Sequence, residues 1–126
     1  MKSIKRGDII YVNLAPRRIG QGHVQSGMRP CVVLSNDKSN QYSGILCVCP
    51  FSGKLKNNPV HVIVSPSDVK GYLEKESDFL AEQIVTIDQR WVMSKVGHIP
   101  EDSEIMEKIN HALSLQLGLL DFLKEV

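Results

Sequence analysis

The first hundred residues alternate between short apolar runs and clusters of turn-forming residues. Each run is rich in β-branched and aromatic residues, which is typical of strands. The runs occupy residues 8–14, 29–35, 44–51, 60–64, 79–87 and 93–98. Glycine, proline, asparagine and serine are frequent between the runs and favour turns there. The pattern therefore predicts one strand in each run.

The spacing of apolar residues changes after Pro100. An acidic opening at residues 101–104 is typical of a helix N-terminus, and apolar residues then recur at steps of three and four. They are Ile105, Ile109, Ala112, Leu113, Leu117 and Leu120. Short strands followed by a terminal amphipathic helix predict a mainly β fold with some α. We expect a small, strongly curved antiparallel β-barrel with the C-terminal helix packed on it.

Length and composition are typical of one globular domain. The 126 residues are 42% hydrophobic and 23% charged, which suffices for one core, so a single domain is expected over residues 1–126. The longest apolar stretch, residues 113–123, contains polar residues and is far shorter than the ~20 residues of a membrane span. The basic opening is not followed by an apolar run, so we expect no signal peptide. These features predict a cytoplasmic protein.

The residue types that bind metals and nucleotides are not grouped in the sequence. Cys31, Cys47 and Cys49 are odd in number and lack the spacing of a zinc knuckle, so we expect them to act as small apolar side chains. The four histidines are scattered. Gly20 and Gly22 precede a strand rather than a helix, unlike the glycines of a phosphate-binding loop. We therefore expect neither a metal nor a cofactor.

Charge is divided unevenly along the chain, although the net charge is only +1. Residues 1–56 carry nine Lys and Arg against two Asp, whereas residues 57–126 carry six basic residues against twelve acidic ones. Two basic connections, residues 15–28 and 52–59, are longer than a hairpin needs. Long loops in compact domains are often functional. A site for a polyanion is therefore expected at these two loops.

Arg29 and Ser52 are the residues at these loops best suited to phosphate chemistry. Arg29 lies between a glycine-containing loop and Pro30, and a guanidinium matches two phosphate oxygens at once. Ser52 places a hydroxyl at the end of an apolar run. A surface arginine at a strand start and a turn-forming serine are the alternative interpretations. Among the histidines, His23 in the first loop is the candidate proton carrier.

Four blocks of the chain, in order, resemble the MazF/PemK toxin family. They are KRGDIIYVNLAP at residues 5–16, GMRPCVVLSND at 27–37, PFS at 50–52, and EQI followed by ID within residues 82–88. The predicted terminal helix also lies where the family has one. The resemblance therefore spans nearly all of the chain.

The resemblance implies an SH3-like barrel of the CcdB/MazF type that forms a homodimer and cleaves single-stranded RNA at specific sequences without a metal. In this family the 2′-OH of the RNA attacks the adjacent phosphate, leaving a 2′,3′-cyclic phosphate and a 5′-OH end. The family's catalytic arginine falls on Arg29, and its catalytic hydroxyl falls on Ser52. The resemblance also implies a MazE-like antitoxin partner with an acidic, disordered tail.

Other residues are candidates for RNA binding through phosphate contacts, base contacts or proton transfer. They are Arg17, Arg18, His23, Gln25, Lys54 and Gln83. The chain departs from the family at two positions. Val24 stands before Gln25 where many members have a glutamate, which leaves His23 as a substitute in proton transfer. Ser52 replaces the commoner threonine and lacks the methyl group that restricts its rotamer.

Two other functions remain open from the sequence. The same barrel occurs in CcdB-like toxins that act on DNA gyrase by protein contact, since a fold does not fix a function. A barrel that retains RNA without cutting it is the third candidate. The presence of both Arg29 and Ser52 favours the nuclease.

Overall fold

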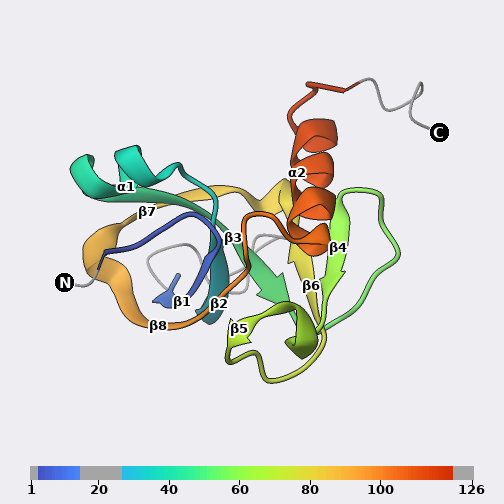
Figure 1. Cartoon of the computed structure of the whole chain (residues 1–126), viewed down its shortest axis with the longest axis horizontal. Helices are drawn as coiled ribbons and strands as arrows, with labels where there is room; N and C mark the ends of the chain where they lie inside the picture. The colour runs from blue at the N-terminus through green and yellow to red at the C-terminus, as the bar shows by residue number, and fades with distance from the viewer. Residues whose placement is uncertain (1–2, 15–26, 121–126) are drawn as a thin grey trace.

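The computed structural model describes residues 3–14 and 27–120, and Arg17, Arg18, His23 and Gln25 lie outside this part of the chain. The described residues form an eight-stranded sheet with helices (Figure 1). The strands are β1 (Asp8–Asn13), β2 (Met28–Val33), β3 (Ile45–Ser52), β4 (His61–Val64), β5 (Lys70–Gly71), β6 (Ser77–Leu80), β7 (Val85–Asp88) and β8 (Val92–His98). The α-helices are α1 (Asp37–Tyr42) and α2 (Glu104–Gln116), and the 3-10 helices are η1 (Pro66–Asp68), η2 (Ala81–Gln83) and η3 (Gln89–Trp91).

The sheet is antiparallel and strongly curled. Its strand order is β4-β6-β3-β2-β1-β8-β5, and β7 also pairs with β3. The strands bend around into a half-barrel, and α2 stands at one end of it beside β4 (Figure 1). The mainly β fold with a C-terminal helix, predicted from the sequence, is therefore confirmed.

Both faces of the central strands are buried, each by its own hydrophobic cluster. Successive side chains of a strand point to opposite faces, so along β1 Ile9 belongs to one cluster and Ile10 to the other. The first cluster also contains Phe51 and Phe79 and the buried face of α2, including Ile109. This two-sided burial explains why the central strands are nearly continuous apolar runs instead of alternating polar and apolar residues.

The predicted strand over residues 79–87 is wrong as a single element. The 3-10 helix η2 divides it into β6 and β7, which pair with opposite ends of β3. Phe79 of β6 lies opposite Phe51, whereas Val85 of β7 lies opposite Val48. The bend lets one segment follow the curl of β3, and neither glycine nor proline marks it in the sequence.

Helix α2 begins and ends at recognisable signals. Ser103 is its N-cap, with its hydroxyl oxygen accepting the Met106 N–H at 3.2 Å, and satisfying such an N–H stabilises the helix start. The helix ends at Gln116, just before Gly118, whose φ of +73° suits glycine. Leu117 and Leu120, expected to continue the apolar face, therefore lie beyond the helix.

Several short elements were not predicted from the sequence: α1, β5 and the 3-10 helices. Helix α1 has six residues, too few for an apolar period, but its N-cap is visible as Asn36, whose side chain accepts the Ser39 N–H at 2.8 Å. Across the described residues, no helix has the length and apolar character needed to cross a membrane.

The cysteines behave as expected for small apolar residues. Cys31 and Cys49 are buried, Cys47 is half-buried, and all three are free thiols. Burial raises the pKa of the Cys47 and Cys49 thiols above the ordinary value. These side chains belong to the core rather than to a reactive site.

Candidate active site

The register of β2 and β3 brings Arg29 and Ser52 together. Cys31 of β2 lies opposite Pro50 of β3. Arg29 lies two residues before Cys31, and Ser52 lies two residues after Pro50. Both are near the strand ends where β2 and β3 meet the long loops. Because strand side chains alternate, both residues point to the same face as that Cys31–Pro50 pair.

Arg29 and Ser52 line the same pocket, which has a volume of about 470 Å³. Its walls also include Tyr11 of β1, Tyr72 and Lys75. A smaller adjoining hollow is lined by Arg29, Ser52, Gly53, Lys54 and Lys75. The two predicted catalytic side chains therefore share one surface cavity, and lysines lie on its rim.

The oxygen of Ser52 is already held by its own loop. Ser52 Oγ accepts a hydrogen bond from the backbone N–H of Lys54 at 3.2 Å. A hydroxyl has one proton to donate besides its two acceptor lone pairs. In this arrangement the Ser52 hydroxyl retains its proton for a hydrogen bond to a ligand in the pocket.

Lys75 is a cation at this site that sequence reasoning missed. A Cβ added to Gly53 would lie 3.1 Å from Lys75 Nζ, so the ammonium lies directly over the backbone that follows Ser52. In the sequence Lys75 stands between Glu74 and Glu76. Because both sequence neighbours are acidic, the charge pattern does not indicate that Lys75 belongs to a basic site. Its place at the site follows from its proximity in space to residues 52–54.

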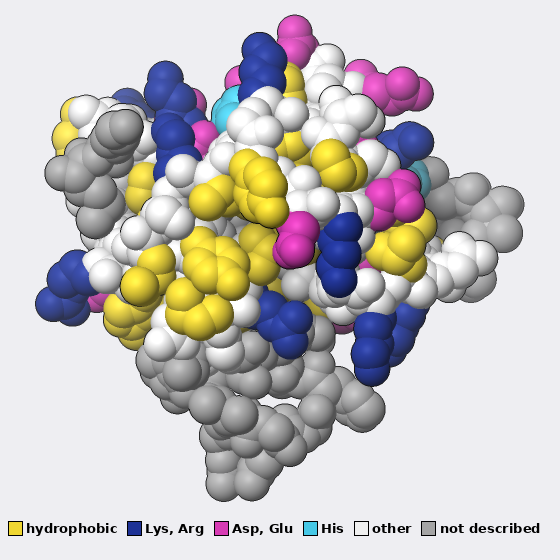
Figure 2. Space-filling view, turned by 90° about the horizontal axis from the view of Figure 1, so that it is seen from below, with side chains coloured by type: hydrophobic (Ala, Val, Ile, Leu, Met, Phe, Trp, Pro, Cys, Tyr) yellow, Lys and Arg dark blue, Asp and Glu magenta, His cyan; other side chains and the backbone are white. Residues whose placement is uncertain are grey.

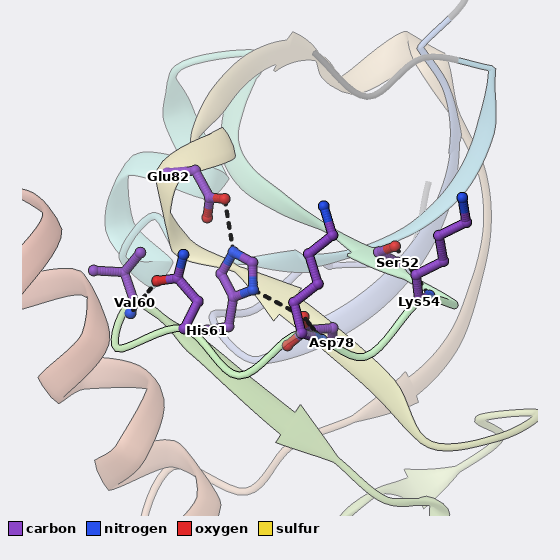
Figure 3. Close-up of polar contacts among 8 residues, drawn as sticks. Ser52, Lys54, Val60, His61, Asp78 and Glu82 are labelled. Carbon is purple, nitrogen blue, oxygen red and sulfur yellow. Dashed lines mark hydrogen bonds and ion pairs between the residues drawn. The ribbon is translucent and has the colours of Figure 1, made fainter. Parts of the chain in front are cut away.

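A buried histidine between two carboxylates lies next to the Ser52 loop. His61 Nδ1 is 2.8 Å from Asp78 Oδ2, and His61 Nε2 is 2.6 Å from Glu82 Oε2 (Figure 3). The side chain of His61 is 4% exposed and that of Asp78 is 0% exposed. Each ring nitrogen of His61 therefore lies within hydrogen-bonding distance of one carboxylate oxygen.

Asp78 also contacts the loop itself. Its backbone lies opposite Ser52 in the β3–β6 ladder, and its Oδ2 accepts the backbone N–H of Lys56 at 3.1 Å. The sequence analysis selected neither Asp78 nor His61. His61 is a polar residue inside the apolar run 60–64, which is a signal that could have identified it, whereas Asp78 follows a polar segment and carries no such signal.

The remaining predicted site residues are placed as follows. Lys54 is exposed and lines the smaller hollow with Arg29 and Ser52. Gln83 is half-buried in η2 and does not line either of the two hollows that contain Arg29. Its proposed base contact stays a prediction. Within residues 3–14 and 27–120, no group of three or more His, Cys, Asp or Glu side chains is arranged to hold a metal ion.

The sequence matches known proteins over most of its length. A family model described as a PemK-like, MazF-like toxin of type II toxin-antitoxin system matches residues 5–117. Endoribonuclease EndoA of Bacillus subtilis (strain 168) is 36% identical over 122 residues, and the match covers 94% of this chain and 98% of EndoA.

Solved structures share the fold. MazF from Deinococcus radiodurans matches with a TM-score of 0.74 and 24% identity over 94% of this chain and 99% of that chain. An endoribonuclease in complex with its cognate antitoxin, from a mycobacterial species, matches with a TM-score of 0.73 and 22% identity over 94% and 98% of the two chains. The family model and the relative in Bacillus subtilis show that the chain belongs to the PemK-like, MazF-like toxin family of type II toxin–antitoxin systems.

Proposed function

We propose that this protein is an endoribonuclease toxin that cleaves single-stranded RNA at Arg29 and Ser52 without a metal. The observation that carries the proposal is the convergence of these two side chains on one cavity bordered by lysines. The relative in Bacillus subtilis bears the name endoribonuclease, which supports the same activity. A CcdB-like action by protein contact is not favoured by these matches.

The reaction uses a nucleophile that the substrate already contains. The 2′-oxygen of a ribose attacks the adjacent phosphorus, and the bond from phosphorus to the 5′-oxygen of the next nucleotide breaks. The 2′-OH loses a proton, and the departing 5′-oxygen gains one. The products are a 2′,3′-cyclic phosphate and a 5′-OH end. DNA lacks the 2′-OH and therefore cannot react in this way.

Attack within one molecule leaves positioning and charge stabilisation as the enzyme's main tasks. The guanidinium of Arg29 can contact two non-bridging phosphate oxygens, where negative charge grows in the transition state. The Ser52 hydroxyl can donate a further hydrogen bond, since its oxygen is held by the Lys54 N–H. Removing one such donor typically lowers the rate about a hundredfold or more.

The lysines around the pocket can bind the RNA backbone on either side of the reacting phosphate. Lys54 and Lys75 both border the hollow that contains Arg29 and Ser52. Contacts to phosphates release counterions, so binding weakens as salt concentration rises. Arg17, Arg18, His23, Gln25 and Gln83 are proposed as further RNA contacts on the basis of the sequence.

The direct test is incubation of a long, defined transcript with the protein in EDTA, followed by mapping of the 5′ ends. We expect fragments with 5′-OH and 2′,3′-cyclic phosphate ends. Arg29→Ala should lower cleavage by about a hundredfold or more with an unchanged circular dichroism spectrum, because Arg29 lies half-exposed at a strand end. Arg90→Ala is the matched control, since Arg90 pairs with Asp88 on an exposed surface.

Three results would contradict the proposal. Full activity of Arg29→Ala would remove the arginine from the site. RNA left intact by the wild-type protein, together with a defect in DNA supercoiling, would favour the CcdB-like alternative. RNA that is retained but not cut would favour a binding barrel.

The proposal extends to the partners of this protein. A mycobacterial endoribonuclease with this fold is known in complex with its cognate antitoxin, and the basic half of the present chain suits the acidic tail of a MazE-like antitoxin. We propose a homodimer as well. Exposed hydrophobic residues on β1, β2 and β8 support it, namely Tyr11, Met28 and Met93. Hydrophobic side chains gather on one face of the molecule, with Lys and Arg side chains around them (Figure 2). One cytoplasmic domain over residues 1–126 completes the proposal.

A further inference from the structure

We infer that Asp78 is a positioning residue that fixes the Ser52 hydroxyl through the backbone of the loop after β3. The inference rests on the proposed function, because it concerns the same hydroxyl. Figure 3 shows Ser52 beside Lys54, and His61 in contact with Asp78 and Glu82, around this loop.

Two backbone N–H groups of the loop form the connection. The N–H of Lys54 donates to Ser52 Oγ at 3.2 Å. The N–H of Lys56, two residues later, donates to Asp78 Oδ2 at 3.1 Å. Asp78 therefore binds the loop backbone at Lys56, and the same loop binds the Ser52 hydroxyl oxygen through the N–H of Lys54. The β3–β6 ladder places Asp78 directly opposite Ser52. Strand pairing therefore fixes the backbone of Asp78 next to the residue after which the loop begins.

The burial of Asp78 is difficult to explain by stability alone. Its side chain is 0% exposed, and Oδ1 has no hydrogen-bond partner among the described residues. A buried polar atom without a partner is unfavourable, and buried ion pairs are poor sources of stability. A carboxylate retained under these conditions indicates a role in positioning.

His61 also contacts the Asp78 carboxylate. Its ring lies between Asp78 and Glu82, with one nitrogen near each. Asp78 Oδ2 therefore contacts both His61 Nδ1, at 2.8 Å, and the backbone N–H of Lys56, at 3.1 Å.

A serine at this position depends more than a threonine would on neighbouring groups to restrict the rotamer of its hydroxyl. A threonine side chain is stiff at χ1 because its Cβ is branched, whereas Ser52 has no methyl group to restrict its rotamer. The N–H of Lys54 can restrict the serine oxygen only if the loop backbone is itself fixed. The Asp78–Lys56 hydrogen bond fixes it.

The test compares cleavage of a defined RNA by variants of the full-length protein. Asp78→Ala should lower kcat by about 10- to 100-fold, since small misplacements of catalytic groups have effects of this size. KM should change less than kcat, because Arg29 lies on β2, outside this loop, and keeps its contact with the RNA phosphate. Asp78→Asn should recover much of kcat, since the amide oxygen can accept the same Lys56 N–H. Asp88→Ala, which also removes a carboxylate from a strand paired with β3, should retain wild-type activity.

Ser52→Thr provides a readout that a purely structural role would not affect. Added to Asp78→Ala, it should restore a large part of the lost kcat, because the methyl group replaces the missing restraint on the hydroxyl. If Asp78→Ala does not fold, Lys56→Pro tests the same hydrogen bond on the exposed loop, because proline has no N–H; it also fixes φ and removes the lysine charge. Lys56→Ala lacks the same charge and keeps the N–H, so it sets the reference rate for that comparison.

Amide hydrogen exchange separates this inference from the proposed function. Asp78→Ala should speed exchange at Lys54 and Lys56 while exchange in β1 and β2 stays unchanged. Unchanged exchange at these two amides, or wild-type kcat in both Asp78→Ala and Lys56→Pro, would overturn the inference. A wild-type protein that cuts no RNA would refute the proposed function instead, and the exchange data would still decide whether Asp78 holds the loop.

Discussion

Replacing Gly7 with alanine tests how the start of β1 is fixed against the rest of the protein. Gly7 has a φ of +93°, in the region that residues with a Cβ rarely adopt. Its N–H donates to the Val33 carbonyl, and its own carbonyl accepts the Ile99 N–H, both at 2.8 Å. The backbone at Gly7 therefore cannot rotate to relieve strain without losing both hydrogen bonds.

The size of the effect follows from the conformation and from the surrounding atoms. A left-handed conformation costs a residue with a Cβ about 1–2 kcal/mol. A Cβ at Gly7 would also lie 2.5 Å from the Ile99 carbonyl oxygen and 3.2 Å from Met106 Cε. Forcing an extra carbon into a packed site typically costs a further ~1–3 kcal/mol. We therefore expect Gly7→Ala to lower the free energy of unfolding by about 2–5 kcal/mol.

Gly44→Ala is the matched control, measured by urea denaturation at the same protein concentration. Gly44 has a φ of +75°, and a Cβ there would meet nothing within 4 Å. Only the conformational cost applies, so the loss should be about 1–2 kcal/mol. Equal losses in the two variants would refute the reasoning, since they would show that the Ile99 carbonyl imposes no steric limit at Gly7.

Three further predictions concern single side chains. Ser52→Ala should reduce RNA cleavage by about a hundredfold or more with little change in thermal stability, whereas Ser52→Thr should remain active, as measured on a defined transcript. The Arg90 guanidinium hydrogen-bonds Asp88 and lowers the pKa of its carboxyl to about 2. The stabilisation from this pair should be present above pH ~4 and lost as the pH falls toward 2. Arg90→Gln should return the NMR titration midpoint of Asp88 toward its ordinary value. Burial raises the thiol pKa values of Cys47 and Cys49, so both should resist iodoacetamide at pH 8 in the folded protein and react in urea.

The sequence could locate Arg29 and Ser52 because Arg29 begins one apolar run and Ser52 follows another, each next to a long basic loop. Their meeting in space follows from strand pairing, since β2 and β3 are antiparallel neighbours and Cys31 lies opposite Pro50. The roles of Arg29 and Ser52 in catalysis stay predictions until the variants are assayed.

The network around Asp78 could not be predicted in the same way. Asp78 and His61 are 17 residues apart in sequence, and they meet because β4 and β6 pair with Ile63 opposite Asp78. Asp78 follows a polar segment in the sequence, which gives no reason to expect burial. All four residues of β6 are buried in the fold, and the Asp78 side chain is buried with them. The break between β6 and β7 escaped prediction for a related reason, because the curl of β3 causes it rather than any residue with a turn preference.

The Arg6-Gly7-Asp8 segment shows that family resemblance and catalytic chemistry rest on different residues. The Arg6 guanidinium donates to the Leu34 carbonyl and to Asn110 Oδ1, both at 2.8 Å, and so joins the end of β2 to α2. Asp8 accepts the Lys5 N–H at 2.8 Å. These contacts lie at the start of β1, whereas Arg29 pairs with Val12 near its end.

A chain could therefore keep Arg6, Gly7 and Asp8, fold in the same way and lack the residues that cut RNA. These three residues fix how β1, the end of β2 and α2 are joined, and they do not line the pocket that contains Arg29 and Ser52. Arg29 and Ser52, in turn, sit at strand ends where a side chain can change with little effect on packing. Because selection for folding alone would not require an arginine and a hydroxyl at those two ends, their joint presence at one pocket is better evidence for the nuclease than the fold itself.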